Sequence, residues 1–126
     1  MRILLVDDET DFVTTLAERL SFRDIEADWA SSAEDALRLA GKNPYDIALL
    51  DIKMPKVSGL ELKKKLKAKY PGMKFIFLTG HGSEDDFLAG TTEAGKNYYL
   101  VKPINIDVLV GKMNEILKEE GGTKNE

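Results

Sequence analysis

The segment IALLD, residues 47–51, consists of four consecutive apolar residues followed directly by an aspartate. A short apolar run of this kind is typical of a strand that is buried on both faces of a sheet. Two similar runs, at residues 3–6 and 75–78, also end at polar residues. We therefore predict a sheet whose buried strands bring polar side chains to one edge.

Helical patterns separate these runs along the chain. Residues 10–20 carry apolar side chains at helical spacing, Ser32 is a suitable N-cap, and residues 25–29 alternate as in a half-exposed edge strand. The predicted strands are 3–6, 25–29, 47–50, 75–78 and 98–101, and the predicted helices are 10–20, 32–41, 58–69, 83–95 and 106–117. Five strands that alternate with five helices predict an α/β fold with a mostly parallel sheet covered on both faces.

Length and composition indicate one domain without special stabilisation. The chain has 126 residues, a formal net charge of −4 and no cysteine, which excludes disulfides and thiolate metal sites. The charge gives no electrostatic footprint for nucleic acid, and no apolar run approaches membrane-spanning length. We expect a cytoplasmic domain over residues 1–120 and a polar, disordered tail over residues 121–126. The lysines between residues 63 and 69 fit a solvated helix face.

Chemically useful side chains follow four of the predicted strands. They are Asp7, Asp8 and Glu9 after the first strand, Asp51 after the third, Thr79 after the fourth and Lys102 after the fifth. The carboxyl ends of parallel strands meet at one edge, so we expect these side chains to share a crevice. Crowded carboxylates raise each other's pKa, and Mg²⁺ with its oxygen ligands would compensate their charge.

A carboxylate in such a crevice can act as the nucleophile toward a phosphoryl group and form an aspartyl phosphate. Phosphoryl transfer needs mainly positioning and charge neutralisation, which a metal ion and Lys102 supply, while Thr79 can bond a phosphoryl oxygen. Taken singly, each residue also fits an ordinary role in a helix start, loop or turn. Together, at four strand ends, they favour phosphoryl chemistry, with Asp51 as the acceptor.

Residues 1 to about 119 resemble the response-regulator receiver domain of two-component systems. The matching motifs are Leu5-Val6-Asp7-Asp8-Glu9, Leu50-Asp51-Ile52-Lys53-Met54-Pro55 with Ser58-Gly59-Leu60, Leu78-Thr79-Gly80, and Tyr99-Leu100-Val101-Lys102-Pro103. The resemblance implies a flavodoxin-like (βα)5 doubly wound parallel sheet with strand order 2-1-3-4-5. It also implies a signalling switch that catalyses only its own phosphoryl transfer and autodephosphorylation.

The resemblance further implies a role for each site residue. Asp51 accepts the phosphoryl group, and Mg²⁺ is held by Asp8, Asp51 and the backbone carbonyl of Lys53, with Asp7 acting through a water molecule. Lys102 contacts a phosphoryl oxygen, Thr79 and Tyr99 form the switch, and the Lys102–Pro103 peptide bond is cis. The implied partners are a histidine kinase or phosphotransfer protein, an output domain or downstream protein, and a second copy after phosphorylation.

Some positions depart from the family pattern or have two interpretations. Lys96 stands where the family usually has alanine, and Gly90-Thr91-Thr92 replaces larger apolar residues in the fourth predicted helix. That helix is therefore predicted to be the least stable one and part of the output surface. Lys53 and His81 lie where the family tunes dephosphorylation, and the alternative is that both are solvent-facing loop residues without a role.

Two other function classes remain as alternatives. A degenerate receiver that binds partners without phosphorylation would have lost the acceptor, a metal carboxylate or the lysine, and this chain retains all of them. A nucleotide-binding protein or small-molecule enzyme on a similar fold would carry a glycine-rich phosphate loop after a strand, and neither G-x-G-x-x-G nor G-x-x-x-x-G-K occurs.

Overall fold

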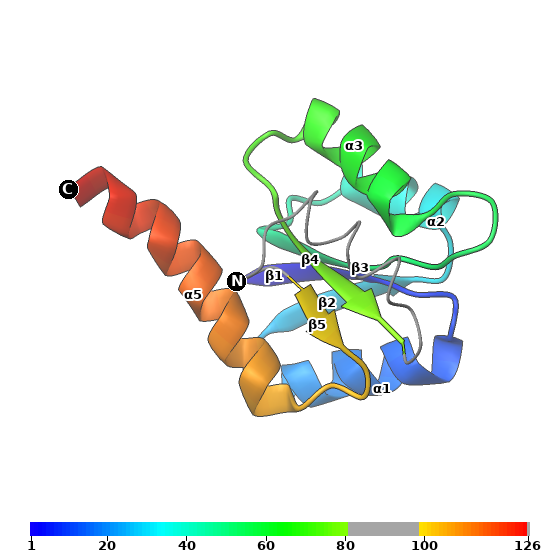
Figure 1. Ribbon diagram of the computed structural model, residues 1–126, viewed down its shortest axis with the longest axis horizontal. Coiled ribbons are helices and arrows are strands. Elements are labelled where there is room, and N and C mark those ends of the chain that lie inside the picture. Colours follow the sequence, from blue (N-terminus) through cyan, green and yellow to red (C-terminus); the bar gives the residue numbers. More distant parts are fainter. Residues whose placement is uncertain (81–98, 126) are drawn as a thin grey trace.

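Five parallel strands form one sheet in the order β2-β1-β3-β4-β5 (Figure 1). The computed structural model describes residues 1–80 and 99–125. The strands are β1 (Arg2–Val6), β2 (Glu26–Ala30), β3 (Ile47–Asp51), β4 (Lys74–Thr79) and β5 (Tyr99–Val101). The flavodoxin-like strand order expected from the sequence is therefore confirmed, and the predicted strands match within one or two residues.

Helices cover both faces of the sheet. In the described part of the chain they are α1 (Thr10–Ser21), α2 (Ala33–Ala40), α3 (Gly59–Lys69) and α5 (Ile106–Asn125). Figure 1 shows α2 and α3 above the sheet, α1 below it and α5 to the left, where its first turns lie near α1. Side chains of a strand alternate between faces, so Leu4 and Leu50 pack under α2 and α3, while Ile3 and Leu49 pack against α1 and α5. The sheet is thus the middle layer of three.

Serine caps begin two of the helices, as the sequence predicted for Ser32. The Ser32 hydroxyl accepts a hydrogen bond from the Asp35 backbone N–H at 3.1 Å, and the Ser58 hydroxyl accepts one from the Glu61 N–H at 3.2 Å. Each bond satisfies one of the amide groups that a helix start leaves without a partner. The caps fix where α2 and α3 start after the strands that precede them.

The last helix is longer than the sequence predicted. Helix α5 runs to Asn125, whereas the predicted helix covered residues 106–117. Each residue added to an existing helix gains a backbone hydrogen bond, so a helix can continue through a polar segment with two glycines. The predicted fourth helix at 83–95, with Gly90-Thr91-Thr92, His81 and Lys96, lies outside the described residues.

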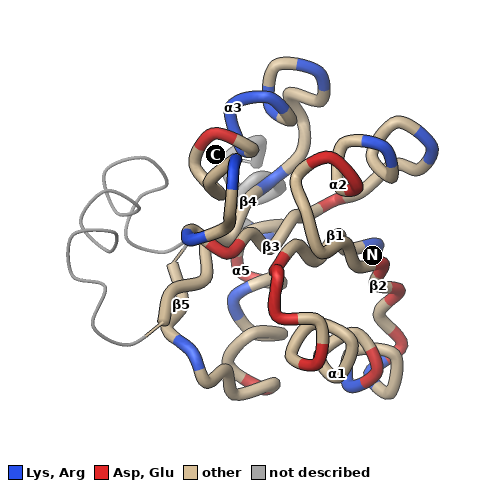
Figure 2. Tube along the Cα trace, turned by 90° about the vertical axis from the view of Figure 1, so that its right-hand side faces the viewer, with Lys and Arg blue, Asp and Glu red and all other residues tan. Residues whose placement is uncertain are grey.

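Helix α3 differs from α1 in the charge that it carries. Figure 2 shows lysines along α3 and acidic residues along α1. Lys64, Lys65, Lys67 and Lys69 are exposed, which agrees with the solvated helix face that the sequence predicted. Within the described residues, no helix combines the length and the apolar character that a membrane span requires.

Strand register brings the carboxyl ends of the central strands to one level. Val6 pairs with Leu50, Asp51 with Leu78, and Thr79 with Val101. The residues that end or directly follow β1, β3, β4 and β5 are therefore neighbours in space. This edge is where the sequence placed its candidate functional residues.

Candidate functional site

Three aspartates meet at the carboxyl edge of the sheet. Asp7 and Asp8 follow β1 directly, and Asp51 is the last residue of β3. One carboxylate oxygen from each lies within 4.8 Å of the others. Asp7 is 0% exposed and Asp51 is 5% exposed, whereas Asp8 is exposed. The prediction that the fold gathers these side chains is confirmed.

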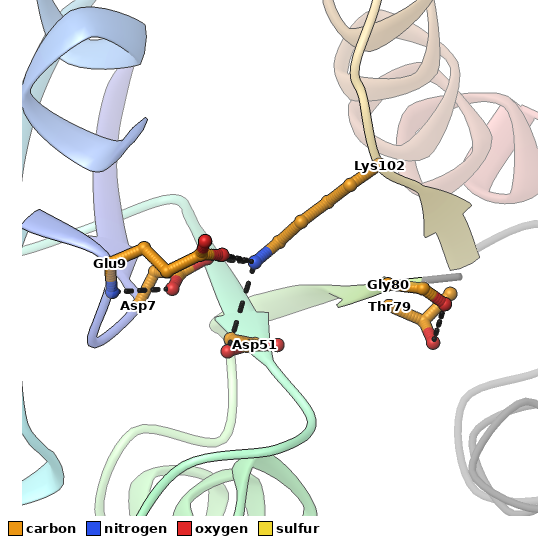
Figure 3. A network of polar contacts seen from close by, with 6 residues as sticks. All are labelled: Asp7, Glu9, Asp51, Thr79, Gly80 and Lys102. Carbon is orange, nitrogen blue, oxygen red and sulfur yellow. Dashed lines mark hydrogen bonds and ion pairs between the residues drawn. The ribbon is translucent and has the colours of Figure 1, made fainter. Parts of the chain in front are cut away.

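Lys102 reaches into this cluster from the end of β5 (Figure 3). Its Nζ lies 2.6 Å from Asp7 Oδ2, 2.7 Å from Glu9 Oε1 and 3.8 Å from Asp51 Oδ2. The Lys102 backbone N–H donates to the Thr79 carbonyl at 2.7 Å, which fixes the residue beside β4. The Lys102–Pro103 peptide bond is cis, as the resemblance implied.

Hydrogen bonds hold the Asp7 carboxylate in place. Its Oδ1 accepts the Glu9 backbone N–H at 2.9 Å, and its backbone N–H donates to the Ala30 carbonyl at 3.1 Å. Both oxygens of Asp7 are therefore engaged, one by the start of α1 and one by Lys102. This arrangement supports an indirect, positioning contribution from Asp7 to any bound cation.

Burial and the neighbouring charges shift the pKa of several side chains in the cluster. Burial raises the pKa of Asp51 to about 7, and the negative charge of Asp7 adds to this increase. Lys102 and the hydrogen bond from the Lys53 backbone N–H lower the Asp51 pKa only in part. Burial also raises the pKa of Asp7. For Lys102, burial acts to lower the pKa, but the bonds to Asp7 and Glu9 outweigh it and the pKa is raised.

The donor set fits a hard divalent cation. Its three aspartates supply only oxygen ligands, and two of them are buried with a pKa above the ordinary value. A positive charge placed among them would relieve both their burial and their mutual repulsion. Oxygen donors that include one exposed carboxylate, Asp8, match the preference of Mg²⁺.

Thr79 and Tyr99 lie on the neighbouring strands. Thr79 ends β4, is 4% exposed, and its hydroxyl donates to the Gly80 carbonyl at 3.3 Å. Tyr99 begins β5, is 7% exposed and stands opposite Phe77 in the β4–β5 register. Thr79 therefore lies two residues further along the paired strands than Tyr99 does.

Gly59 allows the loop after Asp51 to close. A Cβ at this position would lie 2.3 Å from the Asp51 carbonyl oxygen, a distance that no side chain tolerates. The Gly59 N–H donates to the Ile52 carbonyl at 3.0 Å, so the start of α3 is tied against the end of β3. The glycine of the Ser58-Gly59 motif is therefore required by backbone packing next to the acceptor candidate.

Two side chains near Lys102 were not assigned a role from the sequence. Glu9 pairs with the ammonium, and the Phe12 ring centroid lies 4.8 Å from Nζ. The position of Glu9 directly after Asp7-Asp8 and that of Phe12 in the first turn of α1 were the available signals. Residue spacing in the sequence alone does not show which of these long side chains contact one another.

Comparison with known proteins matches residues 3–114 to the response regulator receiver domain. This chain belongs to that family. Receiver domains are the signalling switches of two-component systems, and they bind Mg²⁺ at an acidic pocket. The acidic cluster of this receiver domain lies at the corresponding edge of the sheet.

Individual relatives show how far the similarity extends. Transcriptional regulatory protein PrrA of Mycobacterium tuberculosis is 35% identical over 122 residues, which are 97% of this chain and 52% of PrrA. The chain thus spans about half the length of PrrA and of its counterparts in two other mycobacteria. A CheY-like receiver domain protein from Methanospirillum hungatei is 34% identical with a TM-score of 0.84, and the match covers 97% of each chain.

A second solved structure has a ligand named in its description. A response regulator protein from Burkholderia pseudomallei, with a phosphorylated aspartic acid, calcium ion and citrate, matches with a TM-score of 0.77 and 28% identity. The match covers 94% of this chain and 72% of that protein.

Proposed function

We propose that this receiver domain is a magnesium-dependent switch that takes a phosphoryl group on Asp51. The observation that carries the proposal is the buried Asp51 carboxylate, which ends the central strand beside two further aspartates and 3.8 Å from the Lys102 ammonium. The phosphorylated aspartic acid in the related Burkholderia protein supports the same chemistry. The donor is a histidine kinase, a phosphotransfer protein or a small phosphodonor.

The transfer makes one bond and breaks one bond. An Asp51 carboxylate oxygen attacks the phosphorus atom, and the bond from phosphorus to the donor atom breaks, at the imidazole nitrogen of a phosphohistidine or the acyl oxygen of acetyl phosphate. The donor leaves with the electron pair of the broken bond. The product is a mixed anhydride between the carboxyl group and phosphate. Hydrolysis of this anhydride by water resets the domain.

The cation site uses the oxygens at the end of β1 and β3. Asp8, Asp51 and the Lys53 backbone carbonyl would hold Mg²⁺, and Asp7 would act through a water molecule. When bound, Mg²⁺ neutralises negative charge on the transferring phosphoryl group. Lys102 serves the same purpose from the β5 side by contacting a phosphoryl oxygen.

Thr79 and Tyr99 convert the modification into a change of shape. A phosphoryl oxygen on Asp51 draws the Thr79 hydroxyl away from Gly80, and the Tyr99 ring follows because β4 and β5 are directly paired. The signal reaches a face that contains β5 and α5 and, as the resemblance implies, the predicted fourth helix. Val101 and Val108 on this face are 48% and 54% exposed, which suits contact with a partner.

The partners follow from the family and from chain length. Relatives named as transcriptional regulatory proteins are about twice as long as this chain, so the output is an attached domain or a separate downstream protein. A second copy of the receiver is a further partner after phosphorylation. The domain acts in the cytoplasm and touches neither nucleic acid nor membrane directly.

Intact mass spectrometry tests the proposal. Incubation with acetyl phosphate and Mg²⁺ should add one phosphoryl mass to the wild-type protein and none to Asp51→Asn. Asp46→Asn is a matched control, because Asp46 directly precedes β3 at its opposite end, and it should label like wild type. Equal labelling of Asp51→Asn and wild type would refute Asp51 as the acceptor.

A further inference from the structure

The Lys102 ammonium lies closer to the start of α1 than to Asp51. Nζ is within hydrogen-bond distance of Asp7 and Glu9, at 2.6 and 2.7 Å, but is 3.8 Å from Asp51. The Phe12 ring, also at the start of α1, faces the same ammonium with its centroid at 4.8 Å. Figure 3 shows the ammonium between Glu9 and Asp7 on one side and Asp51 on the other.

Asp7 and Glu9 hold the ammonium in different ways. Asp7 is 0% exposed and is fixed by the Glu9 backbone N–H, so its position is part of the fold. The Glu9 side chain is 63% exposed, and although Glu9 is the N-cap of α1 its side chain makes no capping hydrogen bond. An exposed ion pair contributes little to stability, so the Glu9 carboxylate can leave Lys102 without disturbing the helix.

We propose that Glu9 is a positioning residue that competes with the phosphoryl group of Asp51 for Lys102. The inference rests on the proposed function and adds a regulating residue to it. A phosphoryl group on Asp51 attracts the ammonium, while Glu9 attracts it toward α1. The Glu9 carboxylate also adds a negative charge beside the incoming phosphoryl dianion. Glu9 therefore weakens the hold of the site on the phosphoryl group and keeps the switch readily reversible.

The decisive experiment measures the affinity for beryllofluoride, a tetrahedral phosphoryl mimic, at saturating Mg²⁺. Glu9→Gln keeps the size of the side chain and removes its charge, and it should bind beryllofluoride roughly three- to tenfold more tightly than wild type. Its affinity for Mg²⁺ alone should not increase, because a negative charge near the cation has been removed. Tighter binding of the mimic without tighter binding of the metal is a result that a purely structural role does not produce.

Two matched variants separate the contact from a general field effect. Glu18→Gln removes the same charge from an exposed position further along α1 and should leave the beryllofluoride affinity unchanged. Glu9→Asp keeps the charge but shortens the side chain by one methylene, and it should bind more tightly than wild type if the contact with Lys102 matters. Thermal unfolding checks that all variants are folded.

The outcomes distinguish this inference from the proposed function. Unchanged or weaker beryllofluoride binding by Glu9→Gln, beside normal binding by wild type, would overturn the competition while leaving Asp51 as acceptor. Equal tightening in Glu18→Gln would overturn it too, since a long-range charge effect would then suffice. A wild-type protein that binds no beryllofluoride in Mg²⁺ would overturn the proposed function and this inference together.

Discussion

The amino and carboxyl ends of the sheet differ in how their charged side chains are buried and paired. At the amino end, the Arg2 guanidinium lies 3.4 Å from Asp28, the Tyr45 hydroxyl donates to Asp28 at 2.7 Å, and the Arg2 N–H donates to Asp46 at 2.9 Å. Asp28 is 37% exposed there, whereas at the carboxyl end Asp7 and Asp51 are 0% and 8% exposed by side chain. At the amino end both acids therefore have donors of this chain as partners, and Asp28 is in contact with water.

Among the described residues, the carboxyl end gathers more acidic side chains than the Lys102 ammonium pairs with. Asp7, Asp51 and Glu9 lie near this ammonium and Asp8 lies beside Asp7 and Asp51, while burial holds the pKa of both Asp7 and Asp51 above the ordinary value. A fold tolerates such an arrangement where a ligand supplies the missing charge. The functional edge is therefore marked by an excess of acidic side chains over basic ones, and not merely by the presence of acids.

The largest expected effect is on metal binding at the carboxyl end. Asp8→Ala removes an exposed carboxylate that is proposed to bind Mg²⁺ directly and should lower the Mg²⁺ affinity by about 100-fold. Asp7 is proposed to act through a water molecule, so Asp7→Ala should lower the affinity by about tenfold. Asp28→Asn at the amino end should leave the affinity unchanged. Isothermal titration with Mg²⁺ measures all three. If Asp8→Ala bound Mg²⁺ with unchanged affinity, the proposed cation site at this edge would be refuted.

The next largest effect is expected on the conformational change that follows phosphorylation, and not on phosphorylation itself. Thr79→Ala should be phosphorylated by acetyl phosphate as wild type is, but should lose most of the phosphorylation-induced change in amide chemical shifts around Tyr99, because no hydroxyl remains to follow the phosphoryl group. Thr79→Ser retains the hydroxyl and should keep most of the change. Identical phospho-induced spectra for Thr79→Ala and wild type would show that β4 does not transmit the signal.

A smaller effect, and an increase, is expected in the free energy of unfolding of the metal-free protein. Without metal, Asp51→Asn replaces a buried, poorly compensated carboxylate by a neutral group of the same size, and the free energy of unfolding should rise by roughly 1–2 kcal/mol. Added Mg²⁺ should stabilise wild type and narrow this difference. Urea unfolding with EDTA or with Mg²⁺ measures both effects. A loss of stability in EDTA would mean that the charge at the carboxyl end is already balanced.

The smallest effect lies at the amino end. Tyr45→Phe removes the hydrogen bond to Asp28 and should lower the free energy of unfolding by about 1 kcal/mol, with no effect on phosphorylation. Burial, together with the Asp28 bond, raises the pKa of Tyr45 from 10.0 to about 12 in the folded protein. The folded state therefore keeps the proton longer, and wild type should lose stability relative to Tyr45→Phe as the pH rises from 10.0 to about 12. A constant difference across that range would contradict the raised pKa of Tyr45.

Much of this fold could be predicted because its signals are local. Ile47 to Leu50 is apolar throughout because β3 is buried on both faces, and Asp51 ends that run at the edge where parallel strands place ligands. Ser32 was recognisable as a cap from its side chain alone. The gathering of the aspartates and Lys102 followed from strand ends, which the sequence marks by a change from apolar to polar residues.

What could not be predicted depends on long side chains and on cooperativity. Lys102 has rotamers that reach either Asp51 or Glu9, and only the packing of β5 beside α1 places its ammonium near Glu9 and the Phe12 ring. The last helix was predicted to end at residue 117, yet it continues to Asn125 through Gly121 and Gly122, which are poor helix formers. Strand bounds shifted by one residue where polar residues such as Arg2 join the ladder.

The most direct test of the central claim is to identify the residue that carries the phosphoryl group. After incubation with acetyl phosphate, borohydride reduces an aspartyl phosphate to homoserine, and peptide mass spectrometry locates it in the sequence. The account predicts homoserine at residue 51 alone, formed with Mg²⁺ and absent with EDTA. Homoserine at residue 7 or 8, or labelling at residue 51 that is equal with and without Mg²⁺, would contradict it.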